Sequence, residues 1–430
     1  MKRICVLAML WLAAGVLPER VAAGVNYEEA PINYSVTKPD NIVSRLQSRM
    51  EAGEVRLSLD ARLGYLPAML ERFDVRPSSQ VLPFSKTSLQ DDKIAPSTPR
   101  AIYFNDQIHI GFVQGGLIEI AVADPLLGMV FYTSSNESGV VPEFRRMTNN
   151  CLTCHGAART RNVPGLMVRS VLPTADGHPV IAAGSTLSTP ASPIAKRWGG
   201  WYVTGTHGEE THLGNLILAE ARKPKSIDNT AGHNVTDLST RFDVTKYLTP
   251  HSDIVALMVL EHQSEMYNAL TIAGFEARAA LHRHQLALPT ADSDTTIRLN
   301  TELAKSLEKA ATTAVKPLLF ADETPLKSPI RGTSSFSDDF AQPAAAATVD
   351  HSLRRFNLES RLFQHRCSYL IDSANYKALP IELRCEIARQ IRSALGGETP
   401  PAWLKGTREE HAALLNLLEA SGRLDTGPTN

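Results

Sequence analysis

The chain has 430 residues, a formal net charge of -1 and 21% charged residues. This length predicts two or three domains, with enough chain to bury both a core and a cofactor. Without a basic surplus, general nucleic-acid binding is not expected.

The N-terminus has the pattern of a secretory signal. Lys2 and Arg3 precede an apolar run over residues 4–17, and small residues end at Ala23. We therefore expect a signal peptide at residues 1–23 and a periplasmic or otherwise exported mature chain with no transmembrane segment. An uncleaved membrane anchor is the alternative, although the apolar run is short for a span.

A helical lead-in and a small sheet are predicted next. Helical spacing indicates helices over residues 41–50 and 57–73. Between residues 101 and 133 the pattern changes to period two, which predicts an antiparallel meander of four short strands. Turn residues separate these strands at Asn105-Asp106, Gly115-Gly116 and Asp124-Pro125.

The middle of the chain carries Cys151-Leu152-Thr153-Cys154-His155, the Cys-x-x-Cys-His spacing of covalent haem attachment. Each thiol can bond one vinyl group of the porphyrin, and the adjacent imidazole can ligate the iron. We therefore predict one covalent haem c, with Cys151 and Cys154 as thioether anchors and His155 as the proximal iron ligand. The alternatives are a redox-active Cys-x-x-Cys pair or half of a zinc site.

Pro164 follows His155 by nine positions, within a Gly-, Pro- and Thr-rich stretch without strong periodicity. At this spacing we expect its backbone carbonyl to accept the Nδ1–H of His155, which would orient the imidazole. A simple Pro-Gly turn is the alternative.

The distal iron ligand is left open among several side chains. A predicted helix over residues 254–273 aligns Met258, His262 and Met266 on one face, with His262 ahead of Met266 as a ligand. His207, and after it His212, follows a stretch rich in Trp and Gly. The alternative for the three helix residues is that they pack in the core. The alternative for His207 and His212 is that they are ordinary loop histidines.

Helices dominate the C-terminal half of the sequence. They are expected at 252–284, 295–315 and within 358–420, with a break at Pro289 and a linker over 322–350.

Cys367 and Cys385 lie in two of these predicted helices, over residues 361–371 and 381–395. An antiparallel pairing of the helices about Tyr376 would place both sulfurs at one height, which predicts a disulfide in an oxidising compartment. Two separate buried thiols are the alternative.

Residues 142–200 hold seven basic side chains against two acidic ones, a local surplus of five positive charges. We expect some of them to neutralise the haem propionates, together with the indole N–H groups of Trp198 and Trp201, and the rest to steer an acidic redox partner protein. A solvated basic face is the alternative. The seven are Arg145, Arg146, Arg159, Arg161, Arg169, Lys196 and Arg197.

The haem motif, residues 163–165 and residues 198–207 resemble bacterial exported cytochrome c domain-containing proteins. The resemblance extends from the strands near Ala101 to residues 367–370. It implies kinship with c-type cytochromes. The chain departs from compact class I cytochromes c, because no Met follows the motif at the usual spacing of some tens of residues.

The expected fold is mainly α with a small antiparallel β meander and a cytochrome c-like haem segment embedded in a larger helical protein. The expected function is single-electron transfer by a periplasmic monohaem c-type cytochrome. One alternative is a haem enzyme of peroxidase or oxidase type with an open distal site, in which His207, Glu209 or Glu210 moves protons. Another is a haem-based redox or gas sensor.

The sequence is expected to divide into six parts. They are 1–23, signal peptide; 24–140, lead-in and meander; 141–250, haem segment; 251–321, helical region; 322–350, linker; and 351–430, C-terminal helices.

Overall fold

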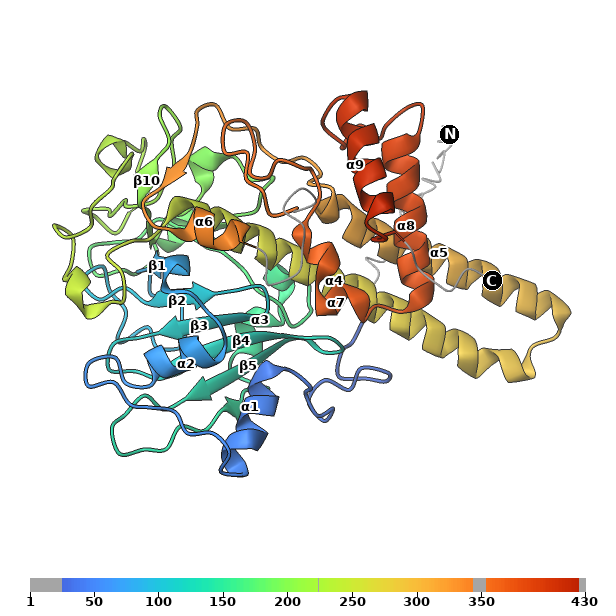
Figure 1. Cartoon of the computed structure of the whole chain (residues 1–430), viewed down its shortest axis with the longest axis horizontal. Coiled ribbons are helices and arrows are strands. Elements are labelled where there is room, and N and C mark those ends of the chain that lie inside the picture. Colours follow the sequence, from blue (N-terminus) through green and yellow to red (C-terminus); the bar gives the residue numbers. More distant parts are fainter. Residues whose placement is uncertain (1–24, 223, 343–352, 425–430) are drawn as a thin grey trace, which may run out of the picture.

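The computed structural model describes residues 25–222, 224–342 and 353–424 (Figure 1). The predicted signal peptide lies outside these residues. Helices hold 37% of the chain and strands 13%, so the fold is mixed α and β rather than mainly helical.

Most strands lie in the first half of the chain, and the longest helices lie in the second half. The helices are α1 (Ile42–Glu51), α2 (Leu66–Arg72), α3 (Leu152–His155), α4 (Ile254–Ala287), α5 (Ser293–Leu318), α6 (Phe336–Ala341), α7 (Ala374–Lys377), α8 (Ile381–Gly396) and α9 (Arg408–Ala420). The strands are β1 (Leu82–Pro83), β2 (Ala101–Phe104), β3 (Ile108–Phe112), β4 (Ile118–Asp124), β5 (Gly128–Ser134), β6 (Arg145–Arg146), β7 (Arg169–Val171), β8 (Ser185–Leu187), β9 (Trp201–Tyr202), β10 (Gly205–Thr206) and β11 (Arg331–Gly332).

The main sheet is antiparallel, with its strands in the chain order β2-β3-β4-β5-β6. Strands β2 to β5 confirm the predicted meander. Strand β6 was missed because two adjacent arginines carry no period-two signal. Because side chains alternate across a strand, the strand register places two rows on one face of the sheet. One row consists of Ile102, Gly111 and Glu119. The neighbouring row consists of His109, Ala121 and Phe131.

The two predicted lead-in helices form to different extents. Helix α1 agrees with prediction, and its N-cap Asn41 accepts the backbone N–H of Ser44 at 3.1 Å. The second helix begins only at Leu66, because residues 57–59 are irregular and residues 60–65 form a turn closed by a bridge between Asp60 and Gly64. There the carboxylate of Asp60 accepts two nearby backbone N–H groups, and Gly64 adopts a φ of 63°, which together favour a turn over a helix.

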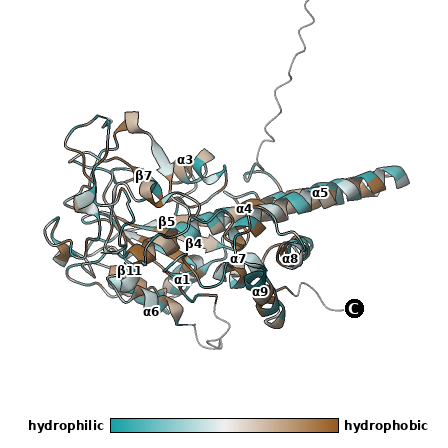
Figure 2. Ribbon diagram, turned by 90° about the horizontal axis from the view of Figure 1, so that it is seen from above, coloured by the Kyte–Doolittle hydropathy of each residue, from teal (hydrophilic) through white to brown (hydrophobic). Residues whose placement is uncertain are grey.

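Helix α4 runs through the middle of the molecule and packs against strand β5 and helix α5 (Figure 1). Helices α4 and α5 confirm both predicted helices, and the connection over residues 288–292 contains the predicted break at Pro289. The far half of this hairpin projects from the body as an arm (Figures 1 and 2). None of residues 281–306 is buried.

The disulfide prediction is wrong for this structure, in which Cys367 and Cys385 are both free. Residues 361–368 form turns and an isolated bridge, and only a short 3-10 turn begins at Tyr369, so the expected helix pair does not exist. Cys367 is buried in the core, whereas Cys385 is exposed on α8.

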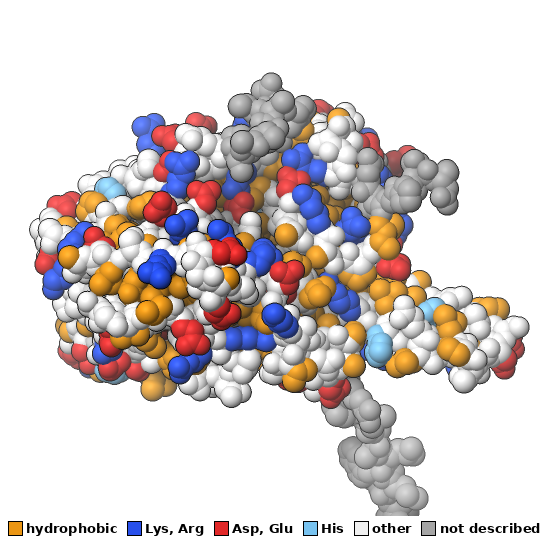
Figure 3. Space-filling model, turned by 60° about the horizontal axis from the view of Figure 1, so that its bottom comes forward, with side chains coloured by type: hydrophobic (Ala, Val, Ile, Leu, Met, Phe, Trp, Pro, Cys, Tyr) orange, Lys and Arg blue, Asp and Glu red, His pale blue; other side chains and the backbone are white. Residues whose placement is uncertain are grey.

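The described part of the predicted linker, residues 322–342, packs onto the body. Strand β11 pairs with β10, and Phe336 and Phe340 of α6 are buried in the core. The linker prediction rested on Pro343 and the four alanines after it, which lie outside the described residues, and it overlooked these two aromatic anchors. No helix in the described ranges is long and apolar enough to cross a bilayer. On the face in Figure 3, acidic and basic side chains are interspersed.

Candidate haem site

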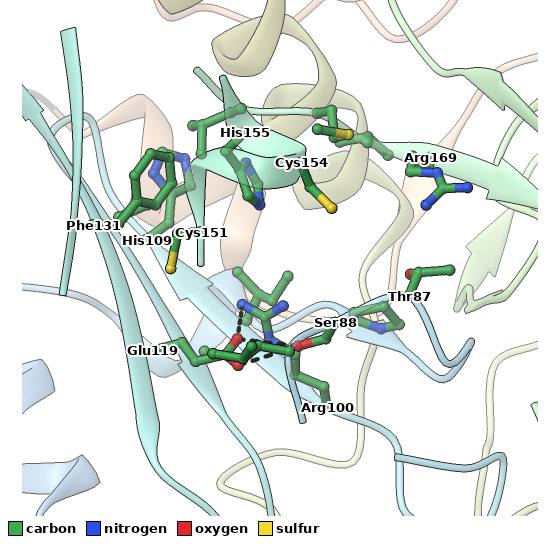
Figure 4. Close-up of a pocket in the computed structure, with 18 of the residues that line it drawn as sticks. Thr87, Ser88, Arg100, His109, Glu119, Phe131, Cys151, Cys154, His155 and Arg169 are labelled. Carbon is green, nitrogen blue, oxygen red and sulfur yellow. Dashed lines mark hydrogen bonds and ion pairs between the residues drawn. The ribbon is translucent and has the colours of Figure 1, made fainter. Parts of the chain in front are cut away.

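A cavity of about 460 Å³ lies between one face of the main sheet and helices α3 and α4 (Figure 4). The sheet contributes the two rows described above, and α4 contributes Leu260 and Ser264. Cavities of about 300–1,000 Å³ lined mainly by apolar groups are typical of cofactor sites.

One helical turn brings the three residues of the motif to this cavity. In α3 the N–H of His155 donates to the carbonyl of Cys151 at 2.9 Å, which closes the turn. Both sulfurs and the imidazole face the same space (Figure 4). Cys151 is half-buried and Cys154 is exposed. The structure therefore brings together Cys151, Cys154 and His155 as the spacing predicts.

His155 is held by Gly165, and this corrects the role expected of Pro164. The Nδ1–H of His155 donates to the Gly165 carbonyl at 2.9 Å, and the Gly165 N–H donates to the His155 carbonyl at 2.8 Å. The Pro164 carbonyl instead accepts the N–H of Met129 in β5 at 3.2 Å. With Nδ1 occupied, the Nε2 of His155 keeps a lone pair for a ligand.

Helix α4 positions the Gly165 carbonyl through an amide clamp. The Oδ1 of Asn268 accepts the N–H of Leu166 at 2.9 Å, and its Nδ2 donates to the Leu166 carbonyl at 2.7 Å. A Cβ at position 165 would lie 2.1 Å from the Asn268 Oδ1, so only glycine fits here. Phe131 packs on the His155 ring at a centroid distance of 4.8 Å.

The charge state of the motif favours a ligand over a redox thiol pair. Burial lowers the pKa of His155, Arg100 lowers it further, and the Gly165 carbonyl and Glu119 oppose them, so the imidazole is neutral at pH 7. Burial raises the pKa of Cys151 to about 11. Redox-active Cys-x-x-Cys pairs have a lowered thiol pKa. In the described ranges no three His, Cys, Asp or Glu side chains converge as for a metal ion.

The cavity wall across from His155 carries a charged pair. The Nη2 of Arg100 lies 2.9 Å from the Oε2 of Glu119. Ser88 and Gln90 also donate to the Glu119 carboxylate, at 3.1 Å and 2.9 Å. Figure 4 shows this pair across the cavity from the imidazole.

The distal candidates on α4 lie away from the cavity lining. His262 is fully buried, its Nε2 bonds the Ser368 hydroxyl at 2.7 Å, and its ring stacks on Phe320 at 4.4 Å. Met258 and Met266 are buried in the hydrophobic core. One helix cannot direct positions 260 and 264, which line the cavity, and position 262 to the same side. Their placement therefore gives no support to a role as distal ligand.

His207 and His212 also lie outside the lining, in a cluster with His233. Their Nε2 atoms are 3.1 Å apart, and the Nε2 of His207 also accepts the N–H of Asn234 at 2.9 Å. The Nδ1 of His212 accepts the Gly214 N–H.

Neither glutamate that the enzyme alternative named lines the cavity. Glu209 is exposed, and the buried carboxylate of Glu210 accepts the N–H of Lys327. The stretch rich in Trp and Gly therefore builds a separate polar network.

Arg169 is the one of the seven counted basic residues that lines the cavity in the described chain. Both indoles expected at a propionate are already bonded: the Nε1–H of Trp198 donates to Glu261 at 2.7 Å, and that of Trp201 to the Arg169 carbonyl at 2.7 Å. Arg197 is buried against Glu261 at 2.9 Å. Arg146 also bonds within the protein, whereas Arg145, Arg159, Arg161 and Lys196 are exposed.

The residues that sequence reasoning missed are Arg100, Glu119, Gly165 and Asn268. Glu119 lies between Ile118 and Ile120 in a predicted strand. The sequence alone therefore indicated a charged side chain on the sheet face opposite to the two isoleucines. Gly165 and Asn268, which contact each other, are about a hundred positions apart, and no local pattern links them.

Comparison of the chain with protein-family models, with curated proteins and with solved structures finds no match.

Proposed function

We propose that this chain is an exported c-type cytochrome that carries one covalent haem and transfers single electrons. The observation that supports this best is the convergence of Cys151, Cys154 and the free Nε2 of His155 on one cavity of cofactor size. The haem iron would supply the redox chemistry by alternating between its ferrous and ferric states.

The surrounding residues fit such a group. Cys151 and Cys154 are free thiols at the edge of the cavity, as thioether formation requires. The Gly165 carbonyl fixes the tautomer of His155, as a hydrogen-bonded partner does for metal-ligating histidines. Apolar side chains such as Ile102, Phe131 and Leu260 exclude water from the interior.

The test is the spectrum of protein produced in a host with intact cytochrome maturation. We expect a pyridine haemochrome of the c type, with colour that stays in the protein after extraction with acidified acetone. Cys154→Ser should leave one thioether and shift the haemochrome band, and a Cys151→Ser, Cys154→Ser double variant should lose the pigment on extraction. Cys385→Ser, which changes an exposed cysteine on α8, is the matched control and should keep the wild-type spectrum. A colourless wild-type protein would contradict the proposal.

An acidic redox partner remains part of this proposal. Arg145, Arg159, Arg161 and Lys196 are exposed around the haem segment. Their charges would steer an acidic partner, and salt would screen them. We expect the electron-transfer rate to fall as ionic strength rises, and a rate that is independent of salt would contradict steering.

The placement of the distal candidates favours a second function, a haem enzyme with an open distal site. In the described chain, the imidazole and thioether side chains that line the cavity outside the motif are His109 and Met167. The Nε2 of His109 bonds the Gln263 amide at 3.1 Å, and Met167 follows the proximal loop. A high-spin ferric spectrum that changes with carbon monoxide on reduction would support this function over the carrier.

A further inference from the structure

Arg100 is fixed in the cavity wall by the residues around its partner. Its Nη2 is 2.9 Å from Glu119, and the two side chains are 23% and 15% exposed. Because Ser88 and Gln90 also donate to Glu119, three donors hold this carboxylate in place. A carboxylate bound this way holds the guanidinium at a defined position.

The guanidinium lies over Gly111 in strand β3. A Cβ at that position would be 2.4 Å from the Nη2 of Arg100 and 2.6 Å from its Nε, so any other residue would displace the side chain. Glycine is otherwise unfavourable in the middle of a strand. Its presence in β3 makes room for a cation on the sheet face.

Arg100 keeps unused hydrogen-bond donors. A guanidinium has five N–H groups, and its Nε is buried without a partner. The Nε is closed off beside Gly111, but Arg100 lines the cavity and its side chain is 23% exposed, so guanidinium N–H groups outside the Glu119 contact are open to a ligand there. Figure 4 shows the guanidinium across the cavity from the His155 ring.

We propose that Arg100 is the hydrogen-bond donor of this cavity for a small anion, which the iron of the proposed haem would bind. The inference rests on the proposed covalent haem and names the class of ligand for its open face: fluoride, cyanide, nitrite or hydroperoxide. Glu119 is a positioning residue that holds the guanidinium at the cavity.

The experiment is a titration of the ferric protein with fluoride, followed by absorbance. A charge-assisted hydrogen bond supports about a 10- to 100-fold gain in affinity, so Arg100→Leu should weaken fluoride binding by about that factor. Imidazole, a neutral ligand that gains nothing from a cation, should not bind more weakly to the variant. Arg100→Lys keeps the charge and should recover part of the fluoride affinity. Arg389→Leu on α8 removes an exposed arginine of a Glu–Arg pair and is the matched control.

Two failures are distinguishable. A wild-type protein without covalent pigment overturns the proposed function, and this inference with it. A pigmented wild-type protein that ignores fluoride, or one whose Arg100→Leu and Arg100→Lys variants bind fluoride as tightly as the parent, overturns the role of Arg100 alone. If Arg100→Leu does not fold, Gly111→Ala is the second variant. It keeps the arginine in the chain but pushes its guanidinium away from the sheet, and it should also weaken fluoride binding.

Discussion

Gly165 shows how much of the site depends on a residue without a side chain. Its carbonyl accepts the Nδ1–H of His155, and its Cα lies against Asn268 of α4. His155 is therefore oriented by a contact between its loop and a helix about a hundred residues later.

Gly165→Ala should destabilise the protein. A methyl group there would lie 2.1 Å from the Oδ1 of Asn268, and the two bonds from that amide to Leu166 restrict its movement. We expect a loss of about 1–3 kcal/mol in the free energy of unfolding, measured by urea denaturation. Gly396→Ala, at the end of α8 and near only the flexible Leu415, should leave it unchanged or slightly raised. Equal stability of Gly165→Ala and the parent would show that the clamp is not rigid.

His262 makes stability depend on pH. Burial lowers its pKa to about 3, so it stays neutral in the folded state, whereas the unfolded chain binds a proton near pH 6.5. Because the unfolded state then binds more protons, the free energy of unfolding should fall with pH below about 6.5, by up to about 1.4 kcal/mol per pH unit.

The prediction for His262 is tested by the change of unfolding free energy with pH, not by its value at one pH. His262→Gln should reduce the loss of unfolding free energy between about pH 7 and 5, measured by urea denaturation. His282→Gln, on the same helix but only half-buried, should retain the wild-type slope. An unchanged slope in His262→Gln would mean that this imidazole is protonated in the folded protein.

At the scale of elements, Asp253 joins the start of α4 to the segment after β11. Its Oδ1 accepts the N–H groups of Val255 and Ala256 at 2.8 Å and 3.2 Å, and its Oδ2 accepts those of Thr333 and Ser334 at 2.9 Å each. The carboxylate is therefore an N-cap and a tether at once.

Asp253→Ala should cost more than an ordinary cap. It leaves several buried N–H groups without acceptors, so we expect a loss above about 2 kcal/mol in unfolding free energy. Asp292→Ala removes the exposed cap of α5, which bonds Thr295 at 2.8 Å, and should cost about 1 kcal/mol. Urea denaturation of both variants gives the comparison, and the reverse order would refute the tether.

The cysteines at the C-terminal end should differ in reactivity. Cys385 is exposed on α8, while Cys367 is fully buried and its pKa is raised to about 12 by burial. A thiol reagent should label Cys385 in the native protein and Cys367 only after unfolding, as mass spectrometry of the labelled peptides can show. If neither cysteine is labelled in unreduced, denatured protein, the two are bridged and the disulfide prediction is correct after all.

The long elements and the haem motif were predictable from sequence, because their signals are local. Period-two alternation identified β2 to β5, and helical spacing identified α4 and α5. The segment over 361–371 has helical spacing but forms no α-helix. Its Leu362 and Phe363 are buried in the core, where Phe363 stacks on Phe340 of α6. The opposite wall of the cavity depends on strand register and on contacts between distant residues, which one sequence does not reveal.

At the scale of the whole molecule, the arm formed by the far ends of α4 and α5 should be open to proteases while the rest of both helices stays packed on the body. Residues 281–306 are not buried, whereas Ala310 and Leu318 of α5 are fully buried against the body. Limited proteolysis should therefore cut first in the connection over residues 288–292. The two fragments should still elute together on size exclusion, and their separation would contradict the packing described for α5.

The cavity is closed by parts of the chain that are made at different times. During synthesis the two thiols emerge more than a hundred residues before Ser264 of α4. An unfinished polypeptide therefore presents both thiols before α4 can cover the cavity. The cavity is therefore complete only after α4 has packed against the sheet, so a group of the proposed size would enter most easily before that step.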